Sequence, residues 1–446
     1  MTPFFLAEAP QVVQRVKERS AALAEARNTS IDHGPSYLES WIESAIGIVS
    51  EGFRFEDYVG LDWIIVAVCV LASCLMVFGF INVFALFAVW LERKVSAHMQ
   101  CRLGPMEVGP HGALQTIADG LKLIAKEDII PRLAHRPLFA LAPMIVFAGV
   151  LIRFVPLPFG EHLVASDMAL GLFFIAAVGS TEVLGVVMAG WASNNKWSVF
   201  ATMRTAAQMV SYEIPIGLAF VTVVVLSGSF SLVDIVYQQA GIDPDALRAG
   251  EPIVVGWFWH WFVFRNPFMP LLMMVYIVAS LAECKRAPFD LPEAESELVS
   301  GFHTEYSGMR FGLFFMAEYG AMYLVAAIAV VLYLGGWWSG IAPLDAIGVG
   351  PDASILASIV GICIKAGVLI SKAIFLVFVQ MWVRWTLPRI RLDQMMYVCW
   401  KVLTPLSLLS LVGATLWELA SGGAAFFGLH PFLVGIGDMI AGWVGY

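Results

Sequence analysis

The sequence has few charged residues and lacks the short motifs of common enzyme sites. Only 14% of its 446 residues are Asp, Glu, Lys or Arg, whereas 59% are hydrophobic. This composition excludes a string of soluble domains and predicts a protein that crosses a membrane many times. No G-x-S-x-G, Walker or dinucleotide-binding glycine motif is present. Hydrolysis, phosphoryl transfer and hydride transfer are therefore not expected within this chain.

Metal-binding and repeat patterns are missing as well. The six cysteines form no C-x-x-C pair, and no histidines stand near them at the spacing of metal ligands. We therefore expect neither a metal site nor an iron–sulfur cluster in this chain. A secondary ion transporter would be expected to show inverted repeats, and none is visible. No basic patch with interleaved aromatic residues suggests nucleic acid.

Eight apolar stretches are each long enough, or nearly so, to form a membrane-spanning helix of about 20 residues. They lie at 62–90, 137–158, 168–191, 206–228, 268–283, 311–335, 354–383 and 401–420. The sequence thus predicts an all-α polytopic membrane protein with about eight transmembrane helices in a core of residues 61–420. A further apolar run lies within the C-terminal tail 421–446 and is broken by His430-Pro431 and Asp438. It predicts either an additional membrane segment or a re-entrant or interfacial segment.

Two other segments show helical spacing of apolar residues. Residues 1–60 are expected to form an amphipathic extension on the membrane surface or on a neighbouring subunit. In the segment 112–126 the apolar residues step by three and four, which predicts an amphipathic helix. This helix lies either in the cytoplasmic membrane interface or on an ordinary protein surface.

The distribution of Lys and Arg predicts the orientation. Most basic loop residues follow the first, third, fifth and seventh predicted spans, and the other loops offer little beyond Arg153, Arg248 and Arg265. By the positive-inside rule the basic loops face the cytoplasm, so the N-terminus is expected on the periplasmic side of a bacterial inner membrane. Trp257, Trp259 and Trp261, with Trp337 and Trp338 nearby, fit an aromatic belt at the outer surface.

Acidic residues are concentrated in residues 283–319, from the end of the fifth predicted span into the first part of the sixth. Seven of the 35 acidic residues lie in this stretch: Glu283, Asp290, Glu293, Glu295, Glu297, Glu305 and Glu318. Carboxylates left charged and unpaired at membrane depth are costly. The stretch is therefore either a solvated loop or the lining of a polar cavity, and the turn at Pro288-Phe289-Asp290 favours the cavity.

A few ionisable residues fall inside predicted spans. They are Glu182, Glu213, Lys365 and Lys372, and Arg204 precedes Glu213 by nine residues. Such groups either serve helix packing in neutral or paired form, or belong to a proton path. Carboxyl groups suit a proton path because burial raises their pKa toward neutrality.

Four long motifs resemble those of the membrane subunit 1/H family of respiratory complex I, NADH:quinone oxidoreductase. They are ERKVSAHMQCRLGPMEVGPHGALQTIADGLKLIAKE at 92–127, SNNKWSVFATMRTAAQMVSYEIP at 193–215, the acidic stretch, and WVRWTLPRIRLDQMMYVCWKVLTPLSL at 382–408. The resemblance covers about residues 62–420. One departure is MEVGP, which stands where the family usually has PNKVGP.

The resemblance implies an eight-helix core with the N-terminus outside and a tilted quinone tunnel. Along its entrance it places Glu92, Arg93, Lys94, Arg102, Asp119 and Lys126. In the loop facing the quinone chamber it places Arg286, Asp290, Glu293, Glu295, Glu297, Glu305 and Arg310. It implies that Glu213, Glu283, Glu318 and Arg204 extend the chamber as an acidic channel for protons.

The same resemblance implies the partners and the chemistry. Quinone, expected to be ubiquinone, is the substrate, and FMN and iron–sulfur clusters belong to partner subunits only. The partners would be the peripheral-arm subunits at the quinone site and the small membrane subunits that lead to the antiporter-like subunits. The chain would then be a subunit of a translocating enzyme that couples quinone reduction to proton transport. Alternatives are the anchor subunit of a membrane-bound hydrogenase or formate hydrogenlyase, a secondary ion transporter and a purely structural anchor.

Overall fold

In the computed structural model, the residues described are 62–160, 163–242, 257–291, 298–341 and 355–421, and the regular elements within these ranges are helices. The predicted extension 1–60 and nearly all of the tail 421–446 lie outside the described residues, as do 292–297. The long helices are α3 (Asp62–Met99), α5 (Arg136–Arg153), α6 (Gly171–Ala192), α7 (Lys196–Ser227), α13 (Gly308–Tyr333), α15 (Ile355–Thr386) and the run α16 (Leu392–Val398), η5 (Cys399–Leu403) and α17 (Thr404–Ser421). The shorter ones are η2 (Pro110–Gly112), α4 (Gln115–Ala125), α8 (Leu232–Gln239), η3 (Phe258–His260), α10 (Phe262–Arg265), α11 (Met269–Glu283) and η4 (Gly301–His303).

The helical membrane architecture is confirmed. Within the described residues, seven helical stretches are long and apolar enough to cross a membrane. The fifth predicted span, α11, has only 15 residues. At a rise of about 1.5 Å per residue it extends over roughly 22 Å, which is short of a typical hydrocarbon core. Pro270 in its first turn and the polar loop after Glu283 limit its length.

Several helices extend beyond their apolar runs. Helix α3 continues to Met99, nine residues past the predicted end at Trp90, so that the sequence Glu92-Arg93-Lys94 is helical. Helix α7 begins at Lys196 rather than near residue 206, because Asn195 caps it by accepting a hydrogen bond from the Trp197 N–H at 3.0 Å. Hydrophobicity marks only the part of a helix in lipid, whereas caps mark where it begins and ends.

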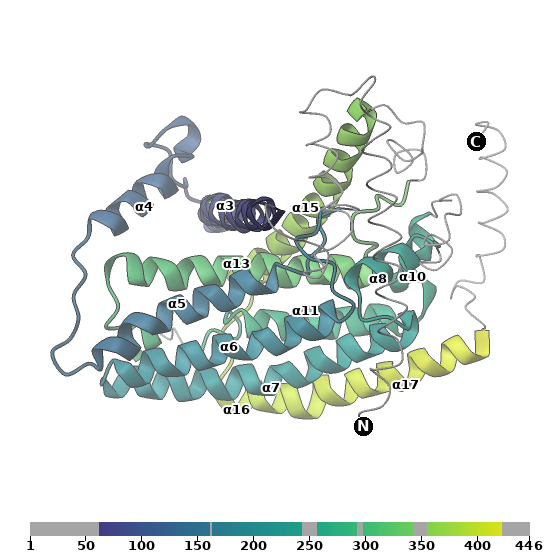
Figure 1. Ribbon diagram of the computed structural model, residues 1–446. Helices are drawn as coiled ribbons and strands as arrows, with labels where there is room; N and C mark the ends of the chain where they lie inside the picture. Colours follow the sequence, from purple (N-terminus) through teal and green to yellow (C-terminus); the bar gives the residue numbers. More distant parts are fainter. Residues whose placement is uncertain (1–61, 161–162, 243–256, 292–297, 342–354, 422–446) are drawn as a thin grey trace, which may run out of the picture. The chain divides into compact units, whose positions relative to one another are not determined.

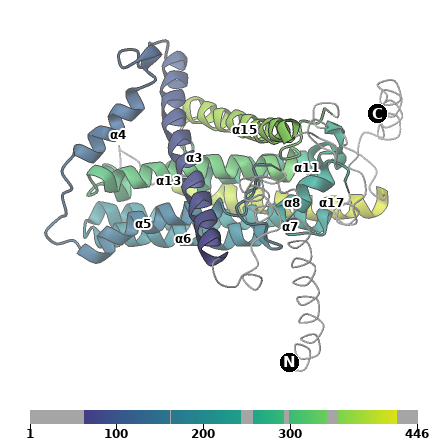
Figure 2. The ribbon, with the colours of Figure 1, turned by 45° about the horizontal axis from the view of Figure 1, so that its top comes forward.

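Helix α13 lies at the centre of the fold. In α13, 83% of the apolar part of the helix is buried inside the protein. In α3 and in α15 the buried share is 28%. Helix α13 packs against α5, α3 and α15, while α5 packs on α6, α6 on α7, and α7 on α11 and α17. Figure 1 shows α5, α6 and α7 running side by side, and Figure 2 shows α3 crossing α13. A Cβ at Gly190 would lie 1.7 Å from Thr202 Oγ1, so glycine permits the close contact of α6 with α7.

The C-terminal end of α13 is held by α15. Lys372 donates hydrogen bonds to the carbonyl oxygens of Leu334 and Trp338 at 2.7 and 2.6 Å, which satisfies acceptors left by the end of α13. Trp337 and Trp338 are 0% and 1% exposed. Their expected place in an exposed aromatic belt is therefore wrong: both rings pack inside the protein, where their large apolar area is buried.

The predicted amphipathic helix is present as α4. Its apolar residues Ile117, Leu121 and Ile124 are exposed, the last two by 63% and 67%. An exposed apolar stripe on a short helix suits a membrane interface, which stays a prediction.

Candidate functional site

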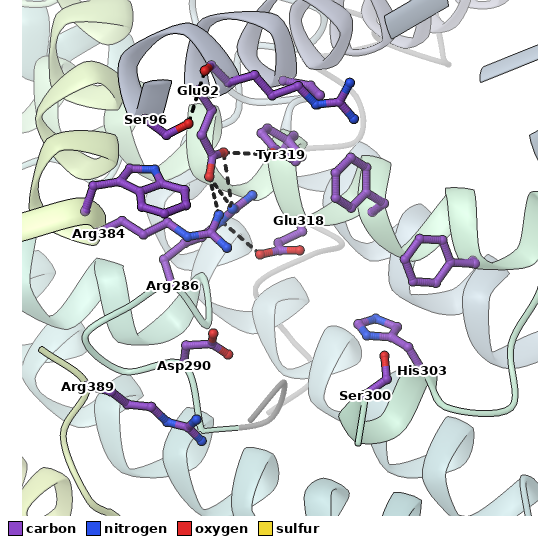
Figure 3. Close-up of a pocket in the computed structure, with 15 residues that line it drawn as sticks. Glu92, Ser96, Arg286, Asp290, Ser300, His303, Glu318, Tyr319, Arg384 and Arg389 are labelled. Carbon is purple, nitrogen blue, oxygen red and sulfur yellow. Dashed lines mark hydrogen bonds and ion pairs between the residues drawn. The ribbon is translucent and has the colours of Figure 1, made fainter. Parts of the chain in front are cut away.

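A cavity of about 910 Å³ lies where α3, α13, α15 and the loop after α11 meet. Its wall mixes acids, arginines and aromatic rings, and Figure 3 shows these side chains facing one another. The lining residues are Val89, Glu92, Arg93, Ser96, Arg286, Asp290, Ser300, His303, Phe311, Phe315, Glu318, Tyr319, Arg384, Trp385 and Arg389. We refer to this space as the chamber.

Glu92 is a buried carboxylate of the chamber that is held by three other side chains. It projects from the extended part of α3 and is 6% exposed. Arg384 of α15 forms an ion pair with it, Arg286 approaches to 3.3 Å, and the Tyr319 hydroxyl donates a hydrogen bond of 2.6 Å. These contacts, drawn in Figure 3, allow a buried carboxylate to stay charged.

Arg286 joins Glu92 to the next acid, Glu318. Its Nε lies 2.9 Å from Glu318 Oε1, and its guanidinium lies 4.4 Å from the centre of the Tyr319 ring. Burial alone would lower the pKa of Arg286, but Glu318, Tyr319 and Glu92 raise it well above its usual value. The guanidinium therefore stays charged. Its Nη2 has no hydrogen-bond partner in the described part of the chain.

A second cluster of ionised groups lies deeper, among α5, α6 and α11. Glu182 of α6, which is 3% exposed, accepts from Arg153 at 2.7 Å and from Lys285 at 2.9 Å. Arg153 also binds Glu283, at 2.7 Å, with its other terminal nitrogen. We call Arg153, Glu182, Lys285 and Glu283 the inner cluster.

A second cavity, of about 210 Å³, adjoins the inner cluster. Arg153, Glu213 and Glu283 line it together with Tyr276 and apolar residues of α6, α7 and α13. Charged groups thus extend from the chamber through the inner cluster to Glu213 in the middle of α7. Such a succession within spanning helices is typical of ion and proton pathways.

His303 lies in the chamber wall, on η4. Burial, assisted by the positive charge of Lys285, lowers its pKa to about 3. The imidazole, which packs against Phe302 with 3.8 Å between ring centres, is therefore neutral at physiological pH.

The structure brings together part of the predicted set. The chamber contains Glu92, Arg93, Arg286, Asp290 and Glu318, and the second cavity contains Glu213 and Glu283. The predicted residues Glu293, Glu295 and Glu297 lie outside the described residues.

Other predicted residues have different surroundings. Asp119 pairs with Arg93 at 2.6 Å and so joins α4 to α3, while Arg310 pairs with Asp128 at 3.1 Å. Glu305 accepts from Asn195 at 2.7 Å. The remaining three do not line the two cavities: Lys94 contacts Met106, Arg102 contacts Gln100, and Lys126 follows the end of α4.

Arg204 was also predicted to lie in the channel. It lies on α7 and is not among the described residues that line either of them. Its proposed place in the channel therefore gains no support from this geometry.

Sequence reasoning misplaced one central residue and overlooked others. Arg153, counted there as a loop base, is 2% exposed and bridges two glutamates. Its apolar neighbours Phe154 and Leu157, both buried, are the signal that could have identified it. Arg384 and Tyr319 were not singled out, because partners distant in sequence define their roles.

Metal ligands are not grouped in the described ranges: no set of three or more His, Cys, Asp or Glu side chains there could hold a metal ion.

Comparison with known proteins gives a consistent match. The family model for NADH dehydrogenase matches residues 72–415. The H subunit of NADH-quinone oxidoreductase from Chlorobaculum parvum is 47% identical over 383 residues, which are 86% of this chain and 98% of that protein. Its counterpart from Chlorobaculum tepidum is 47% identical over 80% of this chain and 94% of its own length. The counterpart from Bacteroides fragilis is 38% identical over 89% of this chain and 99% of its own.

Proposed function

The chain belongs to the NADH dehydrogenase family as an H subunit of NADH-quinone oxidoreductase, and from this premise we propose that its chamber receives the quinone head group. Such a chain is a multi-pass membrane subunit of a bacterial enzyme complex. The relatives favour this function over a hydrogenase anchor or an ion transporter. We further infer that the charged groups beyond the chamber couple quinone reduction to proton movement.

The observation that carries the proposal is the position of Arg286. It lines a cavity of about 910 Å³, has an unpartnered buried N–H group, and contacts both Glu92 and Glu318. A quinone carbonyl oxygen is a hydrogen-bond acceptor, and a buried guanidinium donor without a partner is costly. Phe311 and Phe315 in the same wall supply apolar surface for a ring. Cavities of this kind, which combine apolar surface with a few convergent polar groups, are typical ligand sites.

The coupling follows from electrostatics. Reduction of a quinone in the chamber adds negative charge and takes up protons. That charge competes with Glu92 and Glu318 for Arg286, so the protonation of these acids and of groups beyond them depends on the state of the chamber. The inner cluster and Glu213 then offer successive proton acceptors in the membrane interior. Arg153 and Lys285 keep this series close to charge balance.

The electrons come from outside this chain. We propose that they reach the quinone from iron–sulfur clusters and FMN of partner subunits, which cover the chamber from the cytoplasmic side. Small membrane subunits would continue the proton route from Glu213. The N-terminus would face the periplasm. A membrane-impermeant maleimide would then label exposed Cys101 in inside-out vesicles only, and Cys101→Ser would remove this labelling.

A substitution in the intact complex tests the function. Glu318→Gln removes a titratable group beside Arg286, and we expect quinone reduction and proton translocation by membrane vesicles to fall by at least about tenfold, or 1.4 kcal/mol. NADH oxidation by an artificial acceptor that takes electrons in the peripheral arm should be unchanged. Exposed Asp393→Asn of α16 is the matched control. Normal quinone reduction and proton translocation in assembled Glu318→Gln complex would overturn the proposal.

A further inference from the structure

A small gap separates the chamber from the inner cluster. It measures about 10 Å³ and is lined by two acids, Glu182 and Glu318, and by Lys285 and His303. Glu318 and His303 also line the chamber, whereas Glu182 and Lys285 belong to the inner cluster. The gap is therefore the point at which ionisable residues of the chamber and of the inner cluster face each other.

The gap suits a single water molecule. A buried water needs a volume of about 10–15 Å³ and two to four polar partners. Four polar side chains face this gap, and the apolar Val146, Phe302 and Phe314 close its remaining walls. The gap has room for one water molecule rather than a chain of waters, and it lies directly between Glu318 and Glu182.

Lys285 contributes a positive charge to the wall of the gap. Its ammonium donates to Glu182 at 2.9 Å and lies 5.6 Å from the centre of the Phe302 ring, and the residue is 6% exposed. Its backbone adopts φ 57°, an uncommon conformation for a residue other than glycine. Such conformations gather at functional sites, where the surrounding structure must hold them. The flexible stem of lysine lets the charge move toward either acid of the gap.

We propose that Lys285 gates proton transfer between Glu318 and Glu182 through one water molecule bound in this gap. The inference rests on the proposed function, because it concerns the passage between the chamber and the deeper acids. Lys285 acts as a positioning residue: it does not touch the quinone.

In the proposed gate, the position of the Lys285 ammonium determines which carboxylate stays charged. While the ammonium contacts Glu182, it favours the ionised form of that acid, and Glu318 can hold a proton. When the ammonium turns toward Glu318, Glu182 keeps only Arg153 as a cation and becomes the better acceptor. The O–H bond of Glu318 then breaks, its proton passes to the water, and the water gives one of its own protons to a Glu182 oxygen. Lys285 stays protonated, and the total number of protons is unchanged.

Two variants of the intact complex in inside-out vesicles test the gate. Lys285→Gln removes the charge, and we expect proton translocation to fall about tenfold and the solvent isotope effect on turnover to rise, because proton crossing becomes rate-limiting. Lys285→Arg restores the charge and should recover part of the rate. Exposed Lys196→Gln serves as the matched control with wild-type rates. Unchanged translocation in assembled Lys285→Gln complex would overturn the gate.

A second variant keeps the proposal testable if Lys285→Gln fails to assemble. Val146→Ile adds one methylene to the gap wall without altering charge, and should also slow proton translocation and raise the isotope effect. Normal proton translocation in the Val146→Ile complex would contradict the claim that a water molecule in this gap carries the proton. If Glu318→Gln abolishes translocation while the gap variants do not, the gate fails and the proposed function stands. If Glu318→Gln has no effect either, both fail.

Discussion

Arg153 and Glu182 form an ion pair of 2.7 Å between the last turn of α5 and the middle of α6, with side chains only 3% and 4% exposed. The other terminal nitrogen of Arg153 donates to Glu283, and Lys285 donates to the other carboxylate oxygen of Glu182. Two cations thus face two anions, so the inner cluster is close to neutral in total charge. Ion pairs buried in this way are stable only while every member is present.

Replacing Arg153 by Leu is expected to destabilise the protein strongly. The change leaves Glu182 with one cation and Glu283 without this partner, and breaking a buried pair costs about 3–5 kcal/mol. The measurement is the thermal midpoint of the detergent-solubilised complex, with the amount of assembled complex in the membrane as a second reading. Arg265→Leu is the control, because its pair with Glu418 is 29% and 26% exposed and is therefore partly solvated, so its loss should cost less than that of the fully buried pair. Equal losses in both variants would contradict the argument.

Tyr319→Phe tests the hydrogen bond that holds Glu92. The hydroxyl donates to Glu92 at 2.6 Å, and a hydrogen bond to a charged group contributes about 1.5–3 kcal/mol. The ring that packs against Arg286 is retained, so we expect a lower thermal midpoint and a slower quinone reductase rate with the complex still assembled. Tyr397→Phe, at a ring 56% exposed, is the matched control. A midpoint equal to that of the wild type would show that the bond contributes nothing.

His303 predicts a pH dependence of stability. Its pKa is about 3 in the folded protein and about 6.5 when unfolded, so below pH 6.5 the unfolded state binds the additional proton. The contribution to stability is therefore complete above about pH 6.5 and is lost as the pH falls toward 3, by roughly 1.4 kcal/mol per pH unit.

The test compares thermal midpoints at pH 7.5 and 5.5. His303→Gln should show a smaller decrease than the wild type, while replacement of exposed His98 by Gln should leave the decrease unchanged. If the thermal midpoint of His303→Gln fell as much as that of the wild type, the pH dependence would come from other groups.

The sequence was sufficient for most of the fold because lipid imposes a strong pattern. Each predicted span overlaps a helix, and the shortest predicted span, 268–283, corresponds to α11, which has 15 residues. Helix ends were less predictable: α3 extends nine residues beyond its apolar run, and it is this extension that carries Glu92. Hydrophobicity gives no signal for a polar helix that leaves the membrane.

The site was predictable only in part. Glu92, Arg286 and Glu318 were named from motif resemblance, and the structure places them together. Glu92 and Arg286 are 194 residues apart, and the contacts of Glu92 with Tyr319 and Arg384 join residues 227 and 292 positions apart, so spacing could not reveal that Arg384 and Tyr319 complete the set. Burial of Arg153 likewise depends on how α5 packs against α6, and a single basic residue between apolar neighbours is read as a helix end.

The exposed stripe of α4 gives a prediction about the membrane. A nitroxide attached to a cysteine at Leu121 should collide more often with oxygen, which dissolves in lipid, than with a water-soluble nickel complex. The reason is that Leu121 and Ile124 expose apolar surface of the kind that interfacial helices bury among lipid head groups. A label at the neighbouring Lys122, on the polar face of the same helix, is the matched control and should favour the nickel complex. Equal accessibility at both positions in the reconstituted complex would place α4 on an ordinary water-exposed surface.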